Sequence, residues 1–532
     1  MGRFLLFLLT AIALAQAPIQ VTTRLVQVAV VVRDKHGAVG DLTKADFEIF
    51  DKGKPRDIAS FHMSRASDRV ARVPLPPNTF SNRLNQAADA PVAATVILFD
   101  SLNTAFSDQA YARQQMLTLL KSIDPASPVA IYALGNTLRI LHDFTGDPTR
   151  LQRALESYRT TPSRLLTELR ADSQANINGD PNGSGLLTQI LAPVQAFSTD
   201  RRVALTLAAL QSIANRMAGV PGRKNLIWVS GGFPLTLSFD QQGLAGQSFT
   251  SNYAGAMKDA AIAIDRANVA IYPVDARGLR ASAGTSQPTR SPRTQAGPGG
   301  VYMPPPEALT GSLEIQTMQL LADWTGGRAF FNTNDIQGAV ARAMEDAEVT
   351  YTVGFYADEK DLDGSYHEVR VKVARKGAET RYRKGYFASA VATPTSQSAV
   401  AILQNAIASP ADSTGIGLDA SLAPSQATPG SFVVSLNTDL ENLGLEAQNG
   451  RWTDDLNIAI LQVSATSAVL ESKVRTMRIN VTDQNRDRLR KEGVTLTFTV
   501  TPVPGVSQIR VAVEDQATGN VGALRFLPLQ QP

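Results

Sequence analysis

The sequence predicts an α/β protein with a doubly wound, mainly parallel sheet at its centre, flanked by a small N-terminal β unit and a C-terminal β-sandwich. Three observations predict this fold class. Several segments are continuous apolar runs, typical of strands buried on both faces, and ATVILFD (94–100) is the first. Segments with helical spacing alternate with these runs up to residue 347. Beyond residue 431, short runs alternate apolar and polar residues, as half-buried antiparallel strands do.

Composition excludes several classes of protein. The chain has 532 residues, of which 43% are hydrophobic, so it can form several cores. Lys and Arg number 51 against 48 acidic residues, and a net charge of +3 argues against a nucleic-acid partner. Cysteine is absent, which excludes disulfides, thiolate metal sites and thiol catalysis. The four histidines are far apart in sequence, which argues against a zinc site.

Residues 1–15 have the pattern of a cleaved signal peptide. Arg3 supplies the positive charge, residues 4–14 are apolar except for Thr10, and Ala13-Leu14-Ala15 fits a cleavage site. No later segment holds about 20 apolar residues in a row, the length that a transmembrane helix needs. We therefore expect a secreted or periplasmic protein whose mature chain has no transmembrane anchor.

A small β unit is expected at residues 16–62. Its first strand covers 21–33, where alternation places four valines on one face. Turn sequences follow, and an apolar pair of short strands completes the unit. Residues 63–92 are polar and contain several prolines, so they are expected to form a linker.

The central α/β domain is expected at residues 93–347. Strands are predicted at 94–100, 128–135, 138–144, 225–232, 269–276 and 329–331. Helices are predicted at 109–123, 148–158, 199–217, 253–267, 315–324 and 335–347. Polar insertions are expected at 160–198 and 280–306. In such sheets, ligands bind beyond the carboxyl ends of the strands.

Two further units are expected after the α/β domain. Residues 348–390 contain three antiparallel strands, VTYTVGFY, YHEVRVKVA and TRYRKGYF. Residues 391–430 are rich in Ala, Ser, Thr and Pro and are expected to form a second linker with room for one short helix. The alternating strands of residues 431–532 predict a β-sandwich, for which an immunoglobulin-like arrangement is one option.

The run VILFDSLNTAFSDQA resembles the first strand and metal loop of the von Willebrand factor type A family. Further stretches resemble the VWFA-related family of acidobacterial exported proteins. These are GRKNLIWVSGGFP, VAIYPVDARGL, LADWTGGRAFFNTNDI, the stretch from TYTVGFY to RKGYF, and the N-terminal VVVRDKHGAVGDLTKADFEIFDKGKPRDIASF. The resemblance spans roughly residues 20–390.

The resemblance implies a metal-ion-dependent adhesion site at the top of the sheet. In the family, the first loop reads Asp-x-Ser-x-Ser, and later loops supply a Thr and an Asp. A hard cation such as Mg²⁺ takes about six oxygen ligands, and one position stays open for a carboxylate of the partner protein. The output of such a site is binding, without chemistry.

This sequence matches the metal motif only in part. Asp100 and Thr104 occupy the Asp and second hydroxyl positions, and Thr145 is the best candidate for the distant Thr. Leu102 stands where the first Ser is expected, and glycines 231 and 232 stand where the family places its second Asp. Two oxygen donors are therefore missing.

Three interpretations of this site stay open. The site is degenerate and binds no metal strongly, so that no cofactor is required. Alternatively, Asp100, Thr104 and Thr145 bind Mg²⁺ or Ca²⁺ weakly. In the third interpretation, Asp100 only caps the helix or turn that follows.

Other motifs favour structural roles. DEKDLDG (358–364) resembles a calcium loop, but Arg370 stands at the position that requires a bidentate Glu, so a solvated hairpin is favoured. His142 beside Asp143 has no nucleophile placed next to it, and a surface histidine is favoured. Arg381 and Arg383 are expected on the solvated face of an antiparallel sheet.

The sequence thus predicts a non-enzymatic protein-interaction or cell-adhesion protein with an unknown extracytoplasmic protein as partner. Its expected contact surface is formed by the loops at 100–104, 145–147 and 230–233. One alternative is a structural spacer or scaffold of the cell envelope. Another is an exported hydrolase, although no pair of nucleophile and base can be identified.

Overall fold

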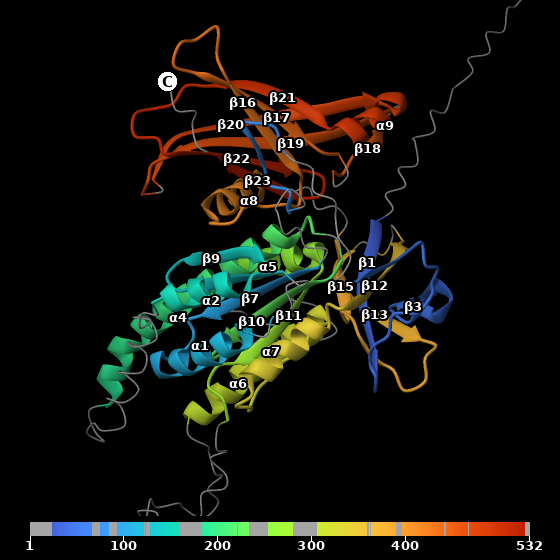
Figure 1. Cartoon of the computed structure of the whole chain (residues 1–532), viewed down its shortest axis with the longest axis vertical. Helices are drawn as coiled ribbons and strands as arrows, with labels where there is room; N and C mark the ends of the chain where they lie inside the picture. Colours follow the sequence, from blue (N-terminus) through green and yellow to red (C-terminus); the bar gives the residue numbers. More distant parts are fainter. Residues whose placement is uncertain are drawn as a thin grey trace, which may run out of the picture.

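A computed structural model describes most of the chain (Figure 1). The described residues are 24–65, 75–84, 93–121, 123, 128–159, 184–220, 222–233, 254–279, 306–358, 361, 363–389, 396–440, 443–448, 450–466 and 468–526. The expected signal peptide lies outside these residues, as do most of the two expected polar insertions.

The central sheet has the predicted doubly wound arrangement. Its strands stand in the order β11-β10-β7-β8-β9. The chain starts in the middle at β7, moves outward through β8 to β9, and then adds β10 and β11 on the other side. Every neighbouring pair is parallel except β8 and β9. The strands are β7 (Ala94–Asp100), β8 (Val129–Leu134), β9 (Leu138–Thr145), β10 (Lys224–Ser230) and β11 (Val269–Asp275).

Helices cover both faces of this sheet because alternate residues of each strand point to opposite sides. In β7, Val96 and Leu98 enter one core, and Ile97 and Phe99 enter the other. The first core is closed by α4 (Ser184–Met217), α5 (Ala254–Ala267) and α6 (Pro306–Thr325). The second is closed by α1 (Phe106–Leu120), α2 (Pro148–Ser157) and α7 (Ile336–Glu345). None of the helices in the described part of the chain has the length and apolar composition that a membrane crossing needs.

The segments expected as two separate β units form one β domain. Strand β1 (Arg24–Asp34) pairs with β12 (Val349–Ala357) and β14 (Glu379–Arg381), and β3 (Phe47–Asp51) pairs with β13 (Asp363–Val373). The other strands are β2 (Gly37–Ala38), β4 (Lys54–Arg56), β5 (Ser60–Arg65) and β15 (Gly385–Ser389), and η1 (Lys44–Asp46) precedes β3. The α/β domain is therefore inserted into the β domain. The valine side chains of β1 are buried against apolar side chains of β12, which follows the α/β domain in the sequence.

The third predicted strand, TRYRKGYF, is split between the two sheets of this β domain. Its first part, β14, pairs with β1, whereas its last part, β15, pairs with β13. The break at residues 382–384 turns Arg383 toward the α/β domain, where it forms an ion pair with Asp265 of α5.

The junction between these two domains contains buried ion pairs. Asp346, which follows α7 and is 1% exposed, accepts hydrogen bonds from Arg381 (2.8 Å) and from the Tyr272 hydroxyl (2.8 Å). Arg33 lies 3.8 Å from the same carboxylate. The expectation that Arg381 and Arg383 lie on a solvated face is therefore wrong, because both side chains neutralise carboxylates of the α/β domain.

The C-terminal region contains two antiparallel sheets around a shared core. One sheet has the order β21-β17-β16-β6, and in the other β18-β19-β22-β23 are joined by β20, which pairs with β19. The strands are β6 (Thr79–Ser81), β16 (Leu418–Pro424), β17 (Phe432–Thr438), β18 (Glu446–Gln448), β19 (Arg451–Val463), β20 (Val469–Thr482), β21 (Val494–Val500), β22 (Gln508–Asp515) and β23 (Val521–Phe526). The helices are α8 (Ser396–Ala408) and α9 (Asp483–Glu492).

Both expected linkers contribute strands to this C-terminal domain. Strand β6 lies within the expected linker 63–92 and pairs with β16, which lies within the expected linker 391–430. The sequence predicted neither strand. Strand β6 has only three residues, and β16 buries only alternate side chains, so neither forms a continuous apolar run.

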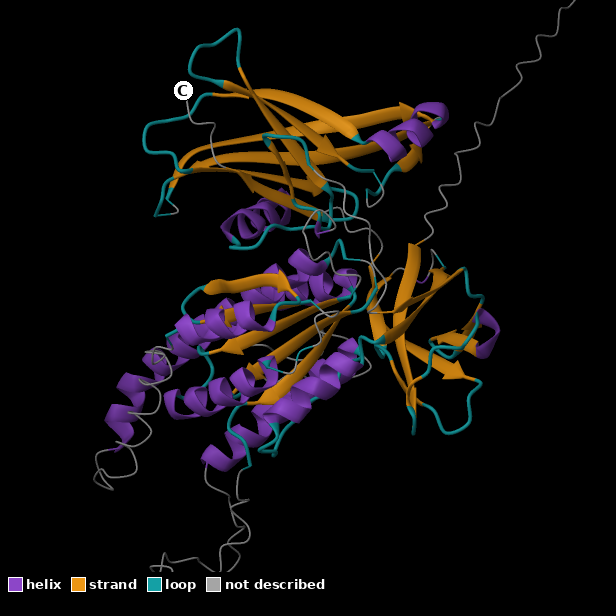
Figure 2. Ribbon diagram, in the orientation of Figure 1, coloured by secondary structure: helices purple, strands orange, loops and turns teal. Residues whose placement is uncertain are grey.

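Both β domains attach to the same end of the α/β domain (Figures 1 and 2). The N-terminal β domain contacts the residue after α7 and the end of α5. The C-terminal domain contacts the end of α4, where the Thr414 nitrogen donates to the Asn215 carbonyl and Thr414 Oγ1 accepts from Gly219. These are the ends opposite to the carboxyl edge of the parallel strands, so that edge faces away from both β domains.

Two carboxyl groups meet in the core of the C-terminal domain. Leu456 pairs with Asp515 across β19 and β22, and Asp454, two residues earlier, points to the same inner face. The Asp515 carboxylate accepts hydrogen bonds from Gly444, Ala517 and Thr518. Burial and the adjacent charge of Asp515 raise the pKa of Asp454 to about 8.

We expect the stability of this domain to fall as the pH rises. The folded state holds a proton on Asp454 that the unfolded chain loses near its ordinary pKa of 3.8, so the stabilisation present below about pH 4 is lost as the pH approaches 8. Calorimetry between about pH 5 and pH 9 should show a falling Tm. Asp454→Asn should flatten this dependence and raise the Tm at pH 9 by about 3 °C or more.

Asp455→Asn is the matched control, because Asp455 forms an exposed ion pair with Arg478 on the same strand pair. This variant should keep the pH dependence of the wild-type chain. Parallel pH profiles for Asp454→Asn and the wild-type chain would contradict the assignment.

Candidate functional site

The register of the central sheet places three strand ends at one edge. Phe99 of β7 pairs with Val229 of β10, and Ser230 pairs with Asp275 of β11. Asp100 and Ser230 therefore lie side by side at the carboxyl edge, where the sequence predicted a site. We refer to this edge and its loops as the crown.

Asp100 is buried at the crown, and its carboxylate accepts four hydrogen bonds. Oδ2 accepts from Asn103 Nδ2 (2.8 Å), Trp228 Nε1 (3.0 Å) and Ser230 Oγ (2.8 Å), and Oδ1 accepts from the Asn103 nitrogen (3.0 Å). Burial raises the pKa of Asp100, although each of these hydrogen bonds acts in the opposite direction. The carboxylate thus connects β7 to β10.

Asn103 connects the same loop to α4. Its Nδ2 also donates to Thr206 Oγ1 (2.9 Å), and its Oδ1 accepts from Arg202 Nε (3.0 Å). The Asn103 side chain does not present its oxygen to Asp100, because that oxygen faces Arg202. The residue instead directs its amide hydrogens at Asp100, and no sequence motif predicted the contributions of Arg202, Thr206 and Trp228.

Thr104 holds the β10 loop against the β7 loop. Its Oγ1 accepts from the Gly231 nitrogen (2.8 Å), and Gln109 Nε2 donates to the carbonyls of Ser101 and Thr104. A Cβ atom at Gly231 would lie 2.9 Å from the Asn103 carbonyl oxygen and 3.1 Å from Thr104 Cα. The position where the family has its second Asp therefore has no room for a side chain.

Thr145 lies at the opposite end of the sheet from Asp100. Strand β9 is antiparallel to β8, so Thr145 pairs with Val129 at the start of β8, whereas Asp100 pairs with Leu134 at its end. Five strand residues separate these ends, which is about 17 Å. Thr145 Oγ1 accepts from the Asp147 nitrogen at the start of α2. The predicted grouping of Asp100, Thr104 and Thr145 is wrong, because the antiparallel edge strand reverses the direction of the chain.

At the crown, hydrogen-bond donors of the protein surround the Asp100 carboxylate. Mg²⁺ needs about six oxygens in an octahedral arrangement. Here, neutral N–H and O–H donors occupy the Asp100 carboxylate, and Leu102 is buried in the core instead of supplying an oxygen. Within the described residues, no group of three or more His, Cys, Asp or Glu side chains could hold a metal ion.

Two of the three loops expected to form the contact surface are buried, and the third, 145–147, lies at the opposite end of the sheet. Residues 100–104 and 230–233 are all buried, because the two loops pack against each other. Large hydrophobic side chains are instead exposed at the same edge: Phe106 (52%), Leu279 (60%) and Phe331 (42%). Phe106 begins α1 after the β7 loop, and Leu279 follows β11. Phe331 follows Phe330, which forms a parallel bridge with Val274 of β11.

Hydrogen bonds hold these three segments together. The Tyr111 hydroxyl of α1 donates to the Asn334 carbonyl (2.7 Å), and Asn334 Oδ1 accepts from the Leu279 nitrogen (2.8 Å). Gly278 has a φ of 71° and brings the β11 loop close to Asn334. Asn334 thus fixes the position of the apolar crown residues. Sequence reasoning missed them because isolated apolar residues in loops carry no motif.

The acidic segment that resembles a calcium loop has a different role. Arg56 of β4 binds Asp358 (2.7 Å), Asp361 (3.1 Å) and the buried Asp51 (3.0 Å). The guanidinium is therefore the cation that these carboxylates surround. His367 lies 3.5 Å from Asp51 in the same interior, and His142 Nδ1 contacts the carbonyl of Asp143.

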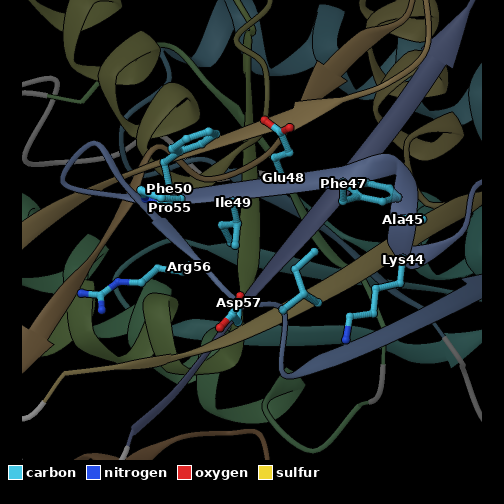
Figure 3. Close-up of a pocket in the computed structure, with 10 residues that line it drawn as sticks. Lys44, Ala45, Phe47, Glu48, Ile49, Phe50, Pro55, Arg56 and Asp57 are labelled. Carbon is cyan, nitrogen blue, oxygen red and sulfur yellow. The ribbon is translucent and has the colours of Figure 1, made fainter.

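An open hollow of about 750 Å³ lies on the β3–β4 hairpin (Figure 3). Phe50, Ile49 and Pro55 line it with polar side chains of η1 and β4, and Arg370 and Lys372 stack on the Phe50 ring. None of the predicted site residues lines this hollow.

No protein-family model and no curated protein matches the chain. Among solved structures, it is similar to an aerotolerance-related membrane protein from Bacteroides fragilis, with 14% identity over 47% of this chain and 98% of that chain and a TM-score of 0.23. It is also similar to a von Willebrand factor type A protein from Catenulispora acidiphila, with 8% identity over 90% of this chain and 75% of that chain and a TM-score of 0.23. A third similarity is to the vWF domain of the type V pili tip protein Mfa5 from Porphyromonas gingivalis, with 16% identity over 29% and 45% of the chains and a TM-score of 0.17. Since these values are low, the doubly wound fold rests on the strand order of this chain.

We expect Gly231→Ala to destabilise the chain by about 1 to 3 kcal/mol, because the added Cβ atom would clash with backbone atoms of the β7 loop. Urea unfolding measures this loss. Gly135→Ala at the same edge is the control, since its Cβ atom would lie 3.6 Å from Ser101 Oγ, an ordinary contact. Equal stabilities of the two variants would show that the loops are not closely packed.

Proposed function

We propose that the protein is an exported, non-enzymatic protein-interaction module that binds an extracytoplasmic partner through the apolar side chains of its crown. The observation that carries this proposal is the exposure of Phe106, Leu279 and Phe331 at the edge that faces away from both β domains. Exposed apolar side chains that cluster on a folded protein are typical of interaction sites. Because Asn334 fixes two of the crown segments, the surface is ordered before the partner binds.

Binding at this crown is independent of metal in our proposal, and the adhesion site is degenerate. The Asp100 carboxylate serves as an acceptor for Asn103, Trp228 and Ser230, which are donors and not metal ligands. A partner carboxylate would meet no cation at this position. Contact through apolar area, which needs no ion, fits the exposed residues better.

Our proposal includes no enzymatic role. A hydrolase needs a nucleophile held next to a base. Among the described residues, the histidine-containing clusters are structural: His142 contacts a backbone carbonyl, and His367 is buried beside Asp51. Export is supported by the signal-peptide pattern of residues 1–15.

A spacer function is the second candidate, and one observation favours it. Buried ion pairs of Asp346 and Asp265 fix the N-terminal β domain to the α/β domain, so the two domains form a stiff unit. A pure spacer needs this stiffness but has no use for an apolar crown.

We expect the double substitution Leu279→Ser and Phe331→Ser to abolish partner capture from an envelope extract of the source organism. Removing two large apolar side chains should weaken binding at least about tenfold if they lie at the centre of the interface. Quantitative mass spectrometry of the captured proteins measures this.

Tyr356→Ser is the matched control, because Tyr356 is 53% exposed on β12, away from the crown. It should leave capture unchanged. Identical capture by all three proteins would contradict the crown surface and favour the spacer function.

We expect Mg²⁺, Mn²⁺ and Ca²⁺ to leave the thermal stability of the chain unchanged. A cation bound only to the folded state would raise the Tm as its concentration exceeds its Kd. Titration calorimetry should show no saturable heat, and partner capture should persist in EDTA. A saturable heat that Asp100→Asn removes would contradict metal independence.

A further inference from the structure

The C-terminal domain presents an unusually long free strand edge. Strand β20 spans 14 residues, beyond the usual 3 to 10, and pairs only with β19 among the strands in the described part of the chain. Most of its side chains are exposed. Its second edge therefore offers backbone N–H and C=O groups along most of its length.

The two faces of β20 differ in chemistry. Lys473 and Arg475 pair with Ile460 and Ile458, whose side chains point between the two sheets. Both basic side chains are nevertheless exposed, so the second sheet does not cover this stretch of β20. In the described part of the chain, Arg475 has no ion-pair partner, and Lys473 contacts only Glu471 of its own strand.

The opposite face of β20 carries one exposed apolar side chain, Val474, between the polar residues Ser472 and Thr476. Val474 pairs with Ala459, which belongs to the core under α8. That helix does not extend over β20, and Val474 is 63% exposed. Val469 and Leu470 near the start of the strand are 57% and 42% exposed.

We propose that β20 binds an extended segment of a partner protein that adds as a further strand and alternates acidic with apolar residues. Backbone hydrogen bonds along the free edge supply affinity, and the side-chain rows supply selectivity. Acidic residues would lie opposite Lys473 and Arg475, and apolar residues would lie beside Val474.

A second copy of the chain fits this edge poorly. Two β20 strands related by a two-fold axis near Val474 would place Lys473 opposite Arg475 of the other copy in both directions. Like charges directly opposite each other destabilise a strand pair. In this register the basic pair therefore opposes self-pairing and favours an acidic strand.

The test uses the full chain and two labelled peptides of ten residues, one alternating Glu with Val and the other alternating Lys with Val. Fluorescence anisotropy should show that the Glu–Val peptide binds at least about fivefold more tightly than the Lys–Val peptide. Hydrogen exchange should slow for amides of β20 when the Glu–Val peptide binds.

Charge reversal supplies the decisive variant. Lys473→Glu with Arg475→Glu should invert the preference in favour of the Lys–Val peptide. Arg370→Glu with Lys372→Glu is the control, because it makes the same charge change at the same spacing on the exposed face of β13. This control should keep the wild-type preference.

Three results would overturn the proposal. In the first, the wild-type chain binds neither peptide, and in the second it binds both equally. In the third, the control variant prefers the Lys–Val peptide. Sedimentation that reveals a dimer of the wild-type chain, lost on charge reversal in β20, would assign the edge to a second copy instead. Because these assays do not involve the crown, their outcome is separate from that of the proposed function.

Discussion

The buried carboxylate of Asp100 is the interaction on which the crown depends. A charged group in an apolar interior is costly unless donors surround it, and Asn103, Trp228 and Ser230 provide them. Through these contacts β7, β10 and α4 are fixed relative to one another, although they are distant in sequence. The loops close over the carboxylate as a result. Phe106, Leu279 and Phe331 are exposed at this edge instead of the loop residues.

This arrangement shows how a family-like motif can keep its position and change its chemistry. The first Asp and the second hydroxyl residue remain at the strand end, where the sequence predicted them. A neutral amide and an indole N–H lie next to the carboxylate and donate hydrogen bonds to it.

Periodicity predicted the central sheet well, because β7, β8, β10 and β11 are buried on both faces and their sequences are continuously apolar. Periodicity did not predict strand pairs whose two members are distant in sequence. The pairing of β1 with β12, the short β6 and the split of TRYRKGYF are set by tertiary contacts that no local pattern records. Thr145 was misplaced for a similar reason, since strand direction at a sheet edge cannot be derived from composition.

The insertion of the α/β domain into the N-terminal β domain has a consequence for biogenesis. The Tyr351 hydroxyl donates to the Val39 carbonyl across 312 residues of chain, and every strand pair between the two segments closes a loop of similar length. Such closure is entropically costly and slow. During synthesis, β1 emerges long before β12 and exposes its valine-rich surface in the meantime. Folding of this domain therefore waits for the synthesis of residue 389, and a chaperone that shields β1 would shorten the period at risk of aggregation.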